Sequence, residues 1–210
     1  MTQHTFHKSE RGSQAAWKGF SSQTTYIAHR LLFLNDNSDF YPESVEDLML
    51  KNNGVVTELV QVKNLGHDLS LSDFSLQKDD SFFRRFLAHS INNNTIILKV
   101  ISFGNIGQEL QGLLDGEEKH TAKIRKKLLN NHGYTTEDID LIFSNIIIEK
   151  VNEDSLVSDI YEKLSSSIET MSAPNIVFDV LVSHVRELSR NEGSTSYLNG
   201  LSLYKKSALI

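Results

Sequence analysis

Three polar side chains between residues 44 and 65 have the types and spacing that metal-assisted hydrolysis requires. Gln61 and Lys63 are separated by one residue, so their side chains share one face of an extended strand, and Asp47 lies on the preceding segment. A carboxylate, an amide or carbonyl oxygen and water are ligands that suit Mg²⁺ or Mn²⁺. A lysine beside such ligands can orient or deprotonate the attacking water, or offset charge that develops on a phosphate.

The segments around these residues predict the hairpin that would bring them together. Residues 44–50 and 55–65 have strand-like patterns and flank an Asn-Asn-Gly turn. In this hairpin Asp47 can meet Gln61 and Lys63 across the two strands. The alternative is an ordinary solvated strand face, because a Gln-x-Lys pattern occurs by chance in many proteins.

The remaining segments alternate between helical and strand-like patterns. Apolar residues recur at helical spacing between residues 14 and 34, although Gly19 could interrupt this helix, and residues 35–42 predict a loop. The order of the patterns predicts an α/β fold, in which a mixed central β-sheet is flanked by helices on both faces. Further helices are expected from residues 78–81 onward, over 107–130 and after Asn152, and interior strands over 95–103 and 140–151.

The chain has 210 residues, which is long enough for one substantial core with an extension. We expect a loose, flexible N-terminal arm over residues 1–14, a core over residues 15–150 that carries Asp47, Gln61 and Lys63, and C-terminal helices with a Gly/Ser/Asn-rich tail over residues 151–210. The last residues carry no stop signal, so we also expect the chain to be a piece of a longer polypeptide.

The composition excludes several classes of protein and site. The sequence has no cysteine, which rules out disulfides, thiolate zinc sites and cysteine nucleophiles. No segment of the sequence approaches the about 20 apolar residues of a membrane-spanning helix, so we expect a cytoplasmic protein without membrane contact. The formal net charge of −6 gives no overall basic excess, so binding to nucleic acid would depend on a local basic strip.

Several segments of the chain resemble one family of nucleases. The pair SVEDLML and ELVQVKN is similar to the PD-(D/E)xK restriction-endonuclease-like nucleases, in the variant in which glutamine replaces the acid before x-Lys. GFSSQTTYIAHRLL, DDSFFRRF and ISFGNIGQEL are similar to the N-terminal double-stranded DNA endonuclease domains of bacterial antiphage effectors, which are fused to cyclic-nucleotide sensors, as in CBASS, or to NTPase sensors. The resemblance covers roughly residues 17–110.

The resemblance implies a role for each residue of the site. Asp47 would be the metal-binding acid, Gln61 the residue beside the metal, and Lys63 the catalytic lysine, with Mg²⁺ or Mn²⁺ as the cofactor. Gln23, on the first helix, corresponds to a supporting position near the metal.

The acid that binds the metal stays open at this point. The proline that usually precedes the acid in this family is absent, and Glu46 precedes Asp47 instead. Glu46 or Glu43 could therefore serve as an additional carboxylate.

Basic side chains near the site are candidates for DNA contacts. Arg84 and Arg85 follow the core motif, and Lys123 and Lys126 belong to a basic stretch of the segment 107–130. Clustered lysines and arginines supply sequence-independent affinity for DNA. Such runs are also common on solvated helix faces, and this alternative stays open.

The function implied by the resemblance is metal-dependent hydrolysis of phosphodiester bonds in DNA, by the effector domain of a bacterial antiphage defence protein. Cutting both strands needs two active sites, so we expect a homodimer or higher homo-oligomer, with a C-terminal sensor or NTPase domain in the full-length protein. RNA stays open as a substrate, because the 2′-hydroxyl contacts that distinguish it are not visible in a sequence. The alternative function is a catalytically silent nuclease-like module for nucleic-acid binding or assembly.

Overall fold

A six-stranded mixed β-sheet forms the centre of the protein, in the order β5-β4-β3-β2-β1-β6. The computed structural model describes residues 3–33, 38–44, 46–91, 93–167, 174–191 and 193–196. Neighbouring strands among β1, β2 and β3 pair antiparallel, whereas β4 pairs parallel with both β3 and β5. The strands are β1 (Ser38–Pro42), β2 (Leu48–Asn52), β3 (Val55–Lys63), β4 (Ile97–Ser102), β5 (Ile146–Lys150) and β6 (Thr195–Ser196).

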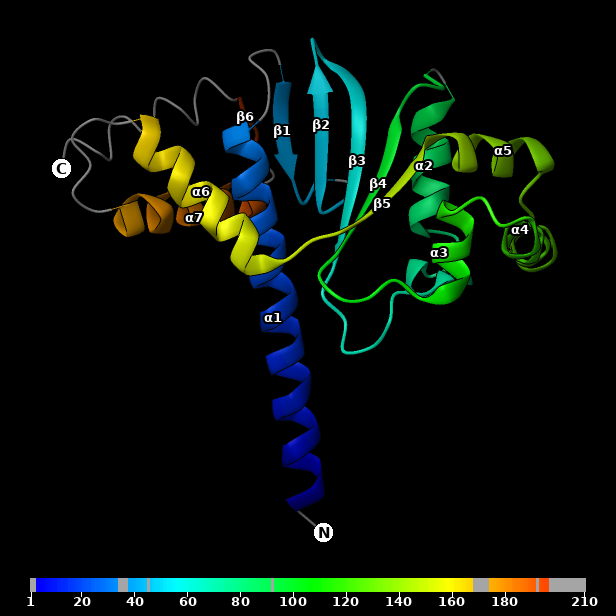
Figure 1. Ribbon diagram of the computed structural model, residues 1–210, viewed down its shortest axis with the longest axis horizontal. Coiled ribbons are helices and arrows are strands. Elements are labelled where there is room, and N and C mark those ends of the chain that lie inside the picture. The colour runs from blue at the N-terminus through cyan, green and yellow to red at the C-terminus, as the bar shows by residue number, and fades with distance from the viewer. Residues whose placement is uncertain are drawn as a thin grey trace.

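Helices cover both faces of this sheet. In Figure 1, α1, α6 and α7 gather on one side, and α2, α3, α4 and α5 lie on the other. The predicted α/β fold, a mixed sheet flanked by helices, is therefore confirmed. Within the described ranges, no helix is long and apolar enough to cross a membrane. The helices are α1 (Gln3–Phe33), the 3₁₀ helix η1 (Leu71–Phe74), α2 (Phe82–Ser90), α3 (Gln108–Leu114), α4 (Glu118–His132), α5 (Thr136–Asn145), α6 (Glu153–Ser167) and α7 (Pro174–Arg190).

The predicted hairpin is formed by β2 and β3, which pair antiparallel with Leu48 opposite Val60. Its turn has positive φ at two successive residues, 51° at Asn53 and 80° at Gly54. Asparagine and glycine tolerate this conformation, and it gives two-residue hairpin turns a twist that matches the strands. The predicted hairpin is present, but its first strand begins at Leu48, so Asp47 lies before the strand that residues 44–50 were expected to form.

Strand β3 separates two hydrophobic cores. Leu59 belongs to the core that α2, α4 and α5 cover, whereas Val60 belongs to the core that α1, α6 and α7 cover. Side chains alternate along a strand, so Gln61 and Lys63 follow Leu59 onto the α2 side of the sheet.

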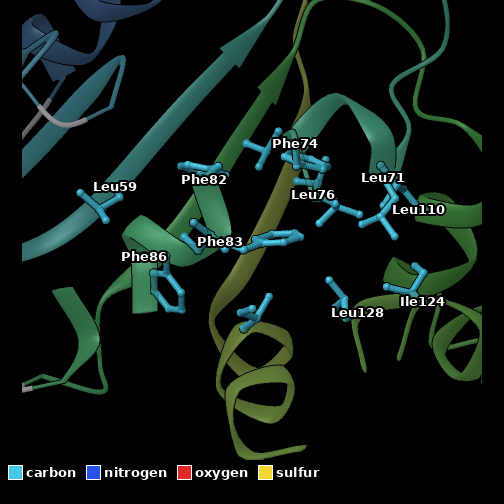
Figure 2. Close-up of a cluster of buried hydrophobic side chains, with 14 of the residues drawn as sticks. Leu59, Leu71, Phe74, Leu76, Phe82, Phe83, Phe86, Leu110, Ile124 and Leu128 are labelled. Carbon is cyan, nitrogen blue, oxygen red and sulfur yellow. The ribbon is translucent and has the colours of Figure 1, made fainter. Parts of the chain in front are cut away.

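Aromatic side chains of α2 fill the core on that side. Phe82, Phe83 and Phe86 are buried, and Figure 2 shows them within one cluster together with Phe74. The rings of Phe74 and Phe83 stack with a centroid distance of 5.2 Å. These contacts fix α2 against the sheet and thereby set the position of Arg85, which this helix carries.

Two segments, one toward each end of the sheet, differ from the sequence predictions. Residues 38–42, expected in a loop, form β1, in which Phe40 is fully buried. The run 140–151, expected as an interior strand, contains the end of α5 and then β5, an edge strand of the sheet. Thr135 and Asp138 form a capping box at the start of α5, so the helix continues into the apolar run before the strand begins.

The helical segments differ from the sequence predictions in length. Helix α1 runs without a break through Gly19 and through residues 3–14 of the expected loose arm, because one glycine costs a helix only about 1 kcal/mol. The segment 107–130, expected as one helix, contains α3 and most of α4. The two helices are separated where Gly116 adopts a φ of 73°. Most of the expected tail, residues 197–210, lies outside the described residues.

Gly107 lies where the chain before α3 approaches Leu69. Its N–H donates to the Leu69 carbonyl at 2.8 Å, and a Cβ atom at Gly107 would lie 2.8 Å from the same oxygen. We expect Gly107→Ala to lower the free energy of unfolding by about 1–3 kcal/mol in urea titrations. Gly66→Ala is the control, because a Cβ there meets nothing within 4 Å. Equal stability of the two variants would contradict this close approach.

Candidate functional site

The loop between β1 and β2 carries Asp47 directly before the first residue of β2. The Val62 N–H donates a hydrogen bond to Asp47 Oδ2 at 2.6 Å. Val62 lies between Gln61 and Lys63, so this bond holds the carboxylate against the end of β3 that carries both polar side chains. The structure therefore brings Asp47, Gln61 and Lys63 together, as the hairpin register predicted.

Gln61 has a buried amide oxygen without a partner. Within the described part of the chain, no donor bonds its Oε1 atom. A buried polar group left unpaired costs about 1–3 kcal/mol, and such groups in native proteins call for a water, an ion or a functional explanation. The position of Gln61 therefore suits a site at which water or a cation completes the contact.

A second acid of the same loop, Glu46, is paired with α2. Its side chain is 1% exposed, and Arg85 Nη2 donates to Glu46 Oε2 at 2.9 Å, while Arg85 Nε donates to Oε1. Arg85 also donates to the carbonyl oxygen of Asp80. Glu46 therefore acts as the counter-ion of Arg85, which joins the loop to α2.

Burial raises the pKa of both acids. It raises the pKa of Asp47 to about 6, although the Val62 hydrogen bond and the charge of Lys63 favour the ionised form. Burial also raises the pKa of Glu46 to about 7, and the Arg85 contact works in the opposite direction. Acids with raised pKa values beside a lysine are typical of binding and catalytic sites.

Hydrogen bonds from Gln23 and Glu43 hold the β1–β2 loop on the side that faces α1. Gln23 Nε2, on α1, donates to Glu43 Oε1, and the Glu43 N–H donates to the Asp47 carbonyl at 3.2 Å. Glu43 has a φ of 53°, which is uncommon for a residue other than glycine, and such strained backbone clusters at functional sites. Gln23 therefore supports the loop through Glu43.

The two arginines predicted to contact DNA have partners within the protein. Arg85 pairs with Glu46, and Arg84 donates to the His132 carbonyl while its guanidinium lies 5.0 Å from the centroid of the Tyr134 ring. Both contacts anchor α2 to other elements, so part of the hydrogen-bonding capacity of each guanidinium is used internally.

The two lysines predicted to contact DNA lie on α4, which does not contribute to the loop or strand of the site. Lys123 Nζ lies 3.5 Å from Glu109 Oε1, and Lys126 is exposed. Their role in phosphate binding stays a prediction.

A cation at this site would be held mainly by oxygen atoms of different kinds. Among the described residues, no group of three or more His, Cys, Asp or Glu side chains could hold a metal ion. Asp47 supplies one carboxylate and Gln61 one unpaired amide oxygen, a set that fits Mg²⁺ because this ion keeps several water ligands. The Mg²⁺ or Mn²⁺ cofactor stays a prediction.

Two backbone groups of this arrangement were missed by sequence reasoning. The Val62 N–H binds Asp47, and the Asp80 carbonyl accepts from Arg85. Every residue except proline carries the same backbone donor and acceptor, so no sequence signal could have identified these two.

Comparison with known proteins gives a likeness in structure alone. No protein-family model and no curated protein matches the chain in sequence. The Acinetobacter baumannii Cap4 SAVED/CARF-domain containing receptor with the cyclic trinucleotide 3′3′3′-cAAA has a TM-score of 0.60 and 12% identity, over 90% of this chain and 44% of that chain. The Moraxella osloensis Cap4 SAVED/CARF-domain containing receptor has a TM-score of 0.56 and 17% identity, over 89% and 47%. These similar proteins are receptors.

This finding corrects the identification made from sequence. The solved structures with a similar fold are described as SAVED/CARF-domain containing receptors, not as PD-(D/E)xK nucleases, so the identification of the chain as a metal-dependent DNA endonuclease was wrong. A Gln-x-Lys pattern on a strand determines only that two polar side chains share a face. It does not determine the reaction, because one fold can carry unrelated functions. The chain spans less than half the length of these receptors, and at this identity the likeness shows the fold alone.

Proposed function

We propose that this chain is a nucleic-acid-binding module of a larger receptor protein, and that it binds a phosphodiester beside Asp47, Gln61 and Lys63. The observation that carries this proposal is the unpaired, buried Oε1 atom of Gln61, next to the strand position that binds the Asp47 carboxylate. The phosphodiester is the chemistry that DNA, RNA and cyclic oligonucleotides share. A binding or assembly module, the alternative function inferred from sequence, agrees better with receptors of similar fold than hydrolysis does.

The charges of the site suit a phosphate that is bridged by a cation. Lys63 attracts the phosphate, whereas Asp47, with a pKa of about 6, is ionised at neutral pH and repels it. Mg²⁺ or Mn²⁺, held by the oxygens of Asp47 and Gln61 and by water, would reduce this repulsion. The net charge of −6 makes such a bridging cation more important for an anionic ligand.

The setting of the module is proposed from the lengths of the similar structures. The matched part is 44% of one receptor and 47% of another. We propose that this chain works beside a further, sensor-type domain in an antiphage defence protein that forms homodimers or higher assemblies. Light scattering of the full protein, with and without a cyclic trinucleotide, measures that assembly.

Binding of labelled double-stranded DNA, single-stranded RNA and a cyclic trinucleotide, with Mg²⁺ or with EDTA, tests the proposed function. We expect Lys63→Met to weaken binding of the recognised ligand at least about tenfold, or about 1.4 kcal/mol, and EDTA to weaken it as well. Lys150→Met is the matched control, because Lys150 ends β5 as Lys63 ends β3, and both pair with Ser102. Lys150 Nζ already bonds to Asn105 Oδ1 at 2.9 Å.

The outcomes of this experiment separate a built site from general charge attraction. Equal losses in Lys63→Met and Lys150→Met would contradict the site, because they would reflect overall charge. The three ligands distinguish DNA, RNA and cyclic oligonucleotides. Enzymatic activity stays a prediction, and gel analysis of the same mixtures measures it. Strand scission that disappears in Asp47→Asn would contradict a role in binding alone.

A further inference from the structure

A pocket of about 390 Å³ lies between η1 with the residues that follow it, and the C-terminal part of α4. Its described lining includes no residue of the site around Asp47, so the pocket is a separate feature of the α2 side of the sheet. Polar side chains line both walls: Ser75, Gln77 and Lys78 belong to one, and Lys127, Asn131 and His132 belong to the other.

Among the described residues that line this pocket, the side chains of fixed charge are two lysines, Lys78 and Lys127. None of the described lining residues is acidic, although the net charge of the chain is −6. Lys127 Nζ lies 2.9 Å from Glu109 Oε2, and Lys123 Nζ lies 3.5 Å from the other oxygen, so two ammonium groups share one carboxylate. Lys78 adds a further ammonium group at the exposed rim. The pocket therefore favours an anion.

The floor of the pocket is apolar and fixed by the core. Leu71 and Leu76 line the pocket and are buried. Figure 2 shows both leucines at the end of the hydrophobic cluster where Ile124 and Leu128 of α4 also lie. Leu71 is 2% exposed and Leu76 is 9% exposed, so the floor offers a planar ring a small apolar area that the core holds in place.

The wall that follows η1 is a series of hydrogen-bonded turns. The Ser75 N–H donates to the Ser72 carbonyl at 3.2 Å, the Lys78 N–H to the Ser75 carbonyl at 2.9 Å, and the Ser81 N–H to the Lys78 carbonyl at 3.1 Å. Ser75 has a φ of 55°, in the left-handed region. These bonds hold the wall in place directly before α2, so the pocket is preformed.

The opposite wall can both donate and accept hydrogen bonds. Burial lowers the pKa of His132, and the charge of Arg84 lowers it further, so the imidazole is neutral at pH 7. A neutral imidazole has one donor and one acceptor, and the amide of Asn131 on the same wall offers both kinds of group, as does the amide of Gln77 on the facing wall. The edge of a nucleobase presents complementary donors and acceptors.

We propose that this pocket binds a nucleoside monophosphate, with the phosphate against Lys78 and Lys127 and the base over Leu71 and Leu76. Its volume of about 390 Å³ falls within the range of small-ligand sites, about 300–1,000 Å³. Lysine ammonium groups bind phosphate as compact charges, the leucines accept the ring, and the amides and imidazole contact the edge of the base. This site is additional to the phosphodiester site proposed above.

Isothermal titration calorimetry with AMP, GMP, CMP, UMP, adenosine and inorganic phosphate tests this proposal. We expect at least one monophosphate to bind at least about tenfold more tightly than adenosine and than inorganic phosphate. Lys78→Met should weaken that binding about tenfold. Lys119→Met is the matched control and should leave it unchanged, because Lys119 is an exposed lysine in the first turn of α4, outside the pocket lining.

Three results would overturn the nucleotide site. The first is an absence of binding for every monophosphate at millimolar concentration. The second is binding that Lys78→Met leaves unchanged. The third is inorganic phosphate that binds as tightly as the monophosphates, since this would indicate an anion site without base recognition. Lys78→Met should not alter ligand binding beside Asp47, so a failure here is distinguishable from a failure of the proposed function.

Discussion

Arg85→Met is expected to destabilise the protein by an amount that grows steeply with pH. The variant removes the bidentate partner of Glu46, whose side chain is 1% exposed. At about pH 6 Glu46 is largely protonated, because its pKa is raised to about 7, and the loss should be about 1 kcal/mol, as for lost hydrogen bonds. Above about pH 7 the free energy of unfolding lost in Arg85→Met should increase by up to about 1.4 kcal/mol per pH unit, toward about 3–5 kcal/mol.

The direction of this effect follows from the linkage between protonation and folding. A carboxyl group whose pKa is higher in the folded than in the unfolded protein stabilises the fold while it is protonated. For Glu46 this stabilisation is complete below the unfolded-state pKa of 4.5 and is lost as the pH rises through the folded-state pKa. In the native protein this loss ends near pH 7. Without Arg85 the folded pKa is higher still, so the loss continues at higher pH. Urea unfolding at about pH 6 and about pH 9 measures the difference.

Two further variants distinguish the charge of Glu46 from a general loss of packing. Arg85→Met combined with Glu46→Gln should lose less stability at about pH 9 than Arg85→Met alone, because glutamine carries no charge. Arg125→Met removes the exposed ion pair with Asp140 and should change stability by less than about 1 kcal/mol at either pH. A loss in Arg85→Met that does not depend on pH would contradict the role of Glu46.

Mg²⁺ is expected to stabilise the protein at about pH 8 but not at about pH 5. Burial raises the pKa of Asp47 to about 6, so this carboxyl is protonated at the lower pH and unable to bind a cation well. A ligand present at about 100 times its Kd stabilises a folded protein by about 2.7 kcal/mol. Urea unfolding with Mg²⁺ and with EDTA, at both pH values, measures the effect.

Asp47→Asn tests the same site through stability. In the absence of metal, this variant should be more stable than the native protein by up to about 2–3 kcal/mol at about pH 8. The reason is that Asp47 stabilises the fold only while it is protonated. This stabilisation is complete below its unfolded-state pKa of 3.8 and is lost as the pH rises through its folded-state pKa of about 6, whereas asparagine stays neutral. Asparagine can still accept from the Val62 N–H. An Mg²⁺ effect of equal size in Asp47→Asn would contradict cation binding at this carboxylate.

The parts of the fold that local chemistry determines were predictable from sequence. The β2–β3 hairpin depends on Asn53, Gly54 and alternation along two strands, all of which are visible in the residues. Strand β1 was missed because its polar residues indicate a loop, and pairing with β2 together with packing in the core under α1, α6 and α7 buries Phe40. The boundary between α5 and β5 was missed because an apolar run suits either element, and the cap at Thr135 decides between them.

The candidate site was predictable to a similar extent. Strand alternation places Gln61 and Lys63 on one face of β3, and the hairpin register brings the residue before β2, Asp47, to the Val62 N–H; both are local properties. The pairing of Arg85 with Glu46 was not predictable, because it depends on where α2 packs against the sheet. The functional identification failed for a related reason: a few polar residues on a strand define a geometry, whereas the reaction or ligand depends on everything that surrounds them.

The hydrogen bond between Val62 and Asp47 also gives the protein an internal spectroscopic reporter. The Val62 amide belongs to the central strand, and its hydrogen points at a carboxylate whose charge changes near pH 6. A bond to a charged acceptor is stronger than a bond to a neutral one, and amide resonances respond to that difference. One backbone resonance of β3 should therefore follow protonation of Asp47, and it offers a test of cation or ligand binding at the proposed site without any label on the ligand.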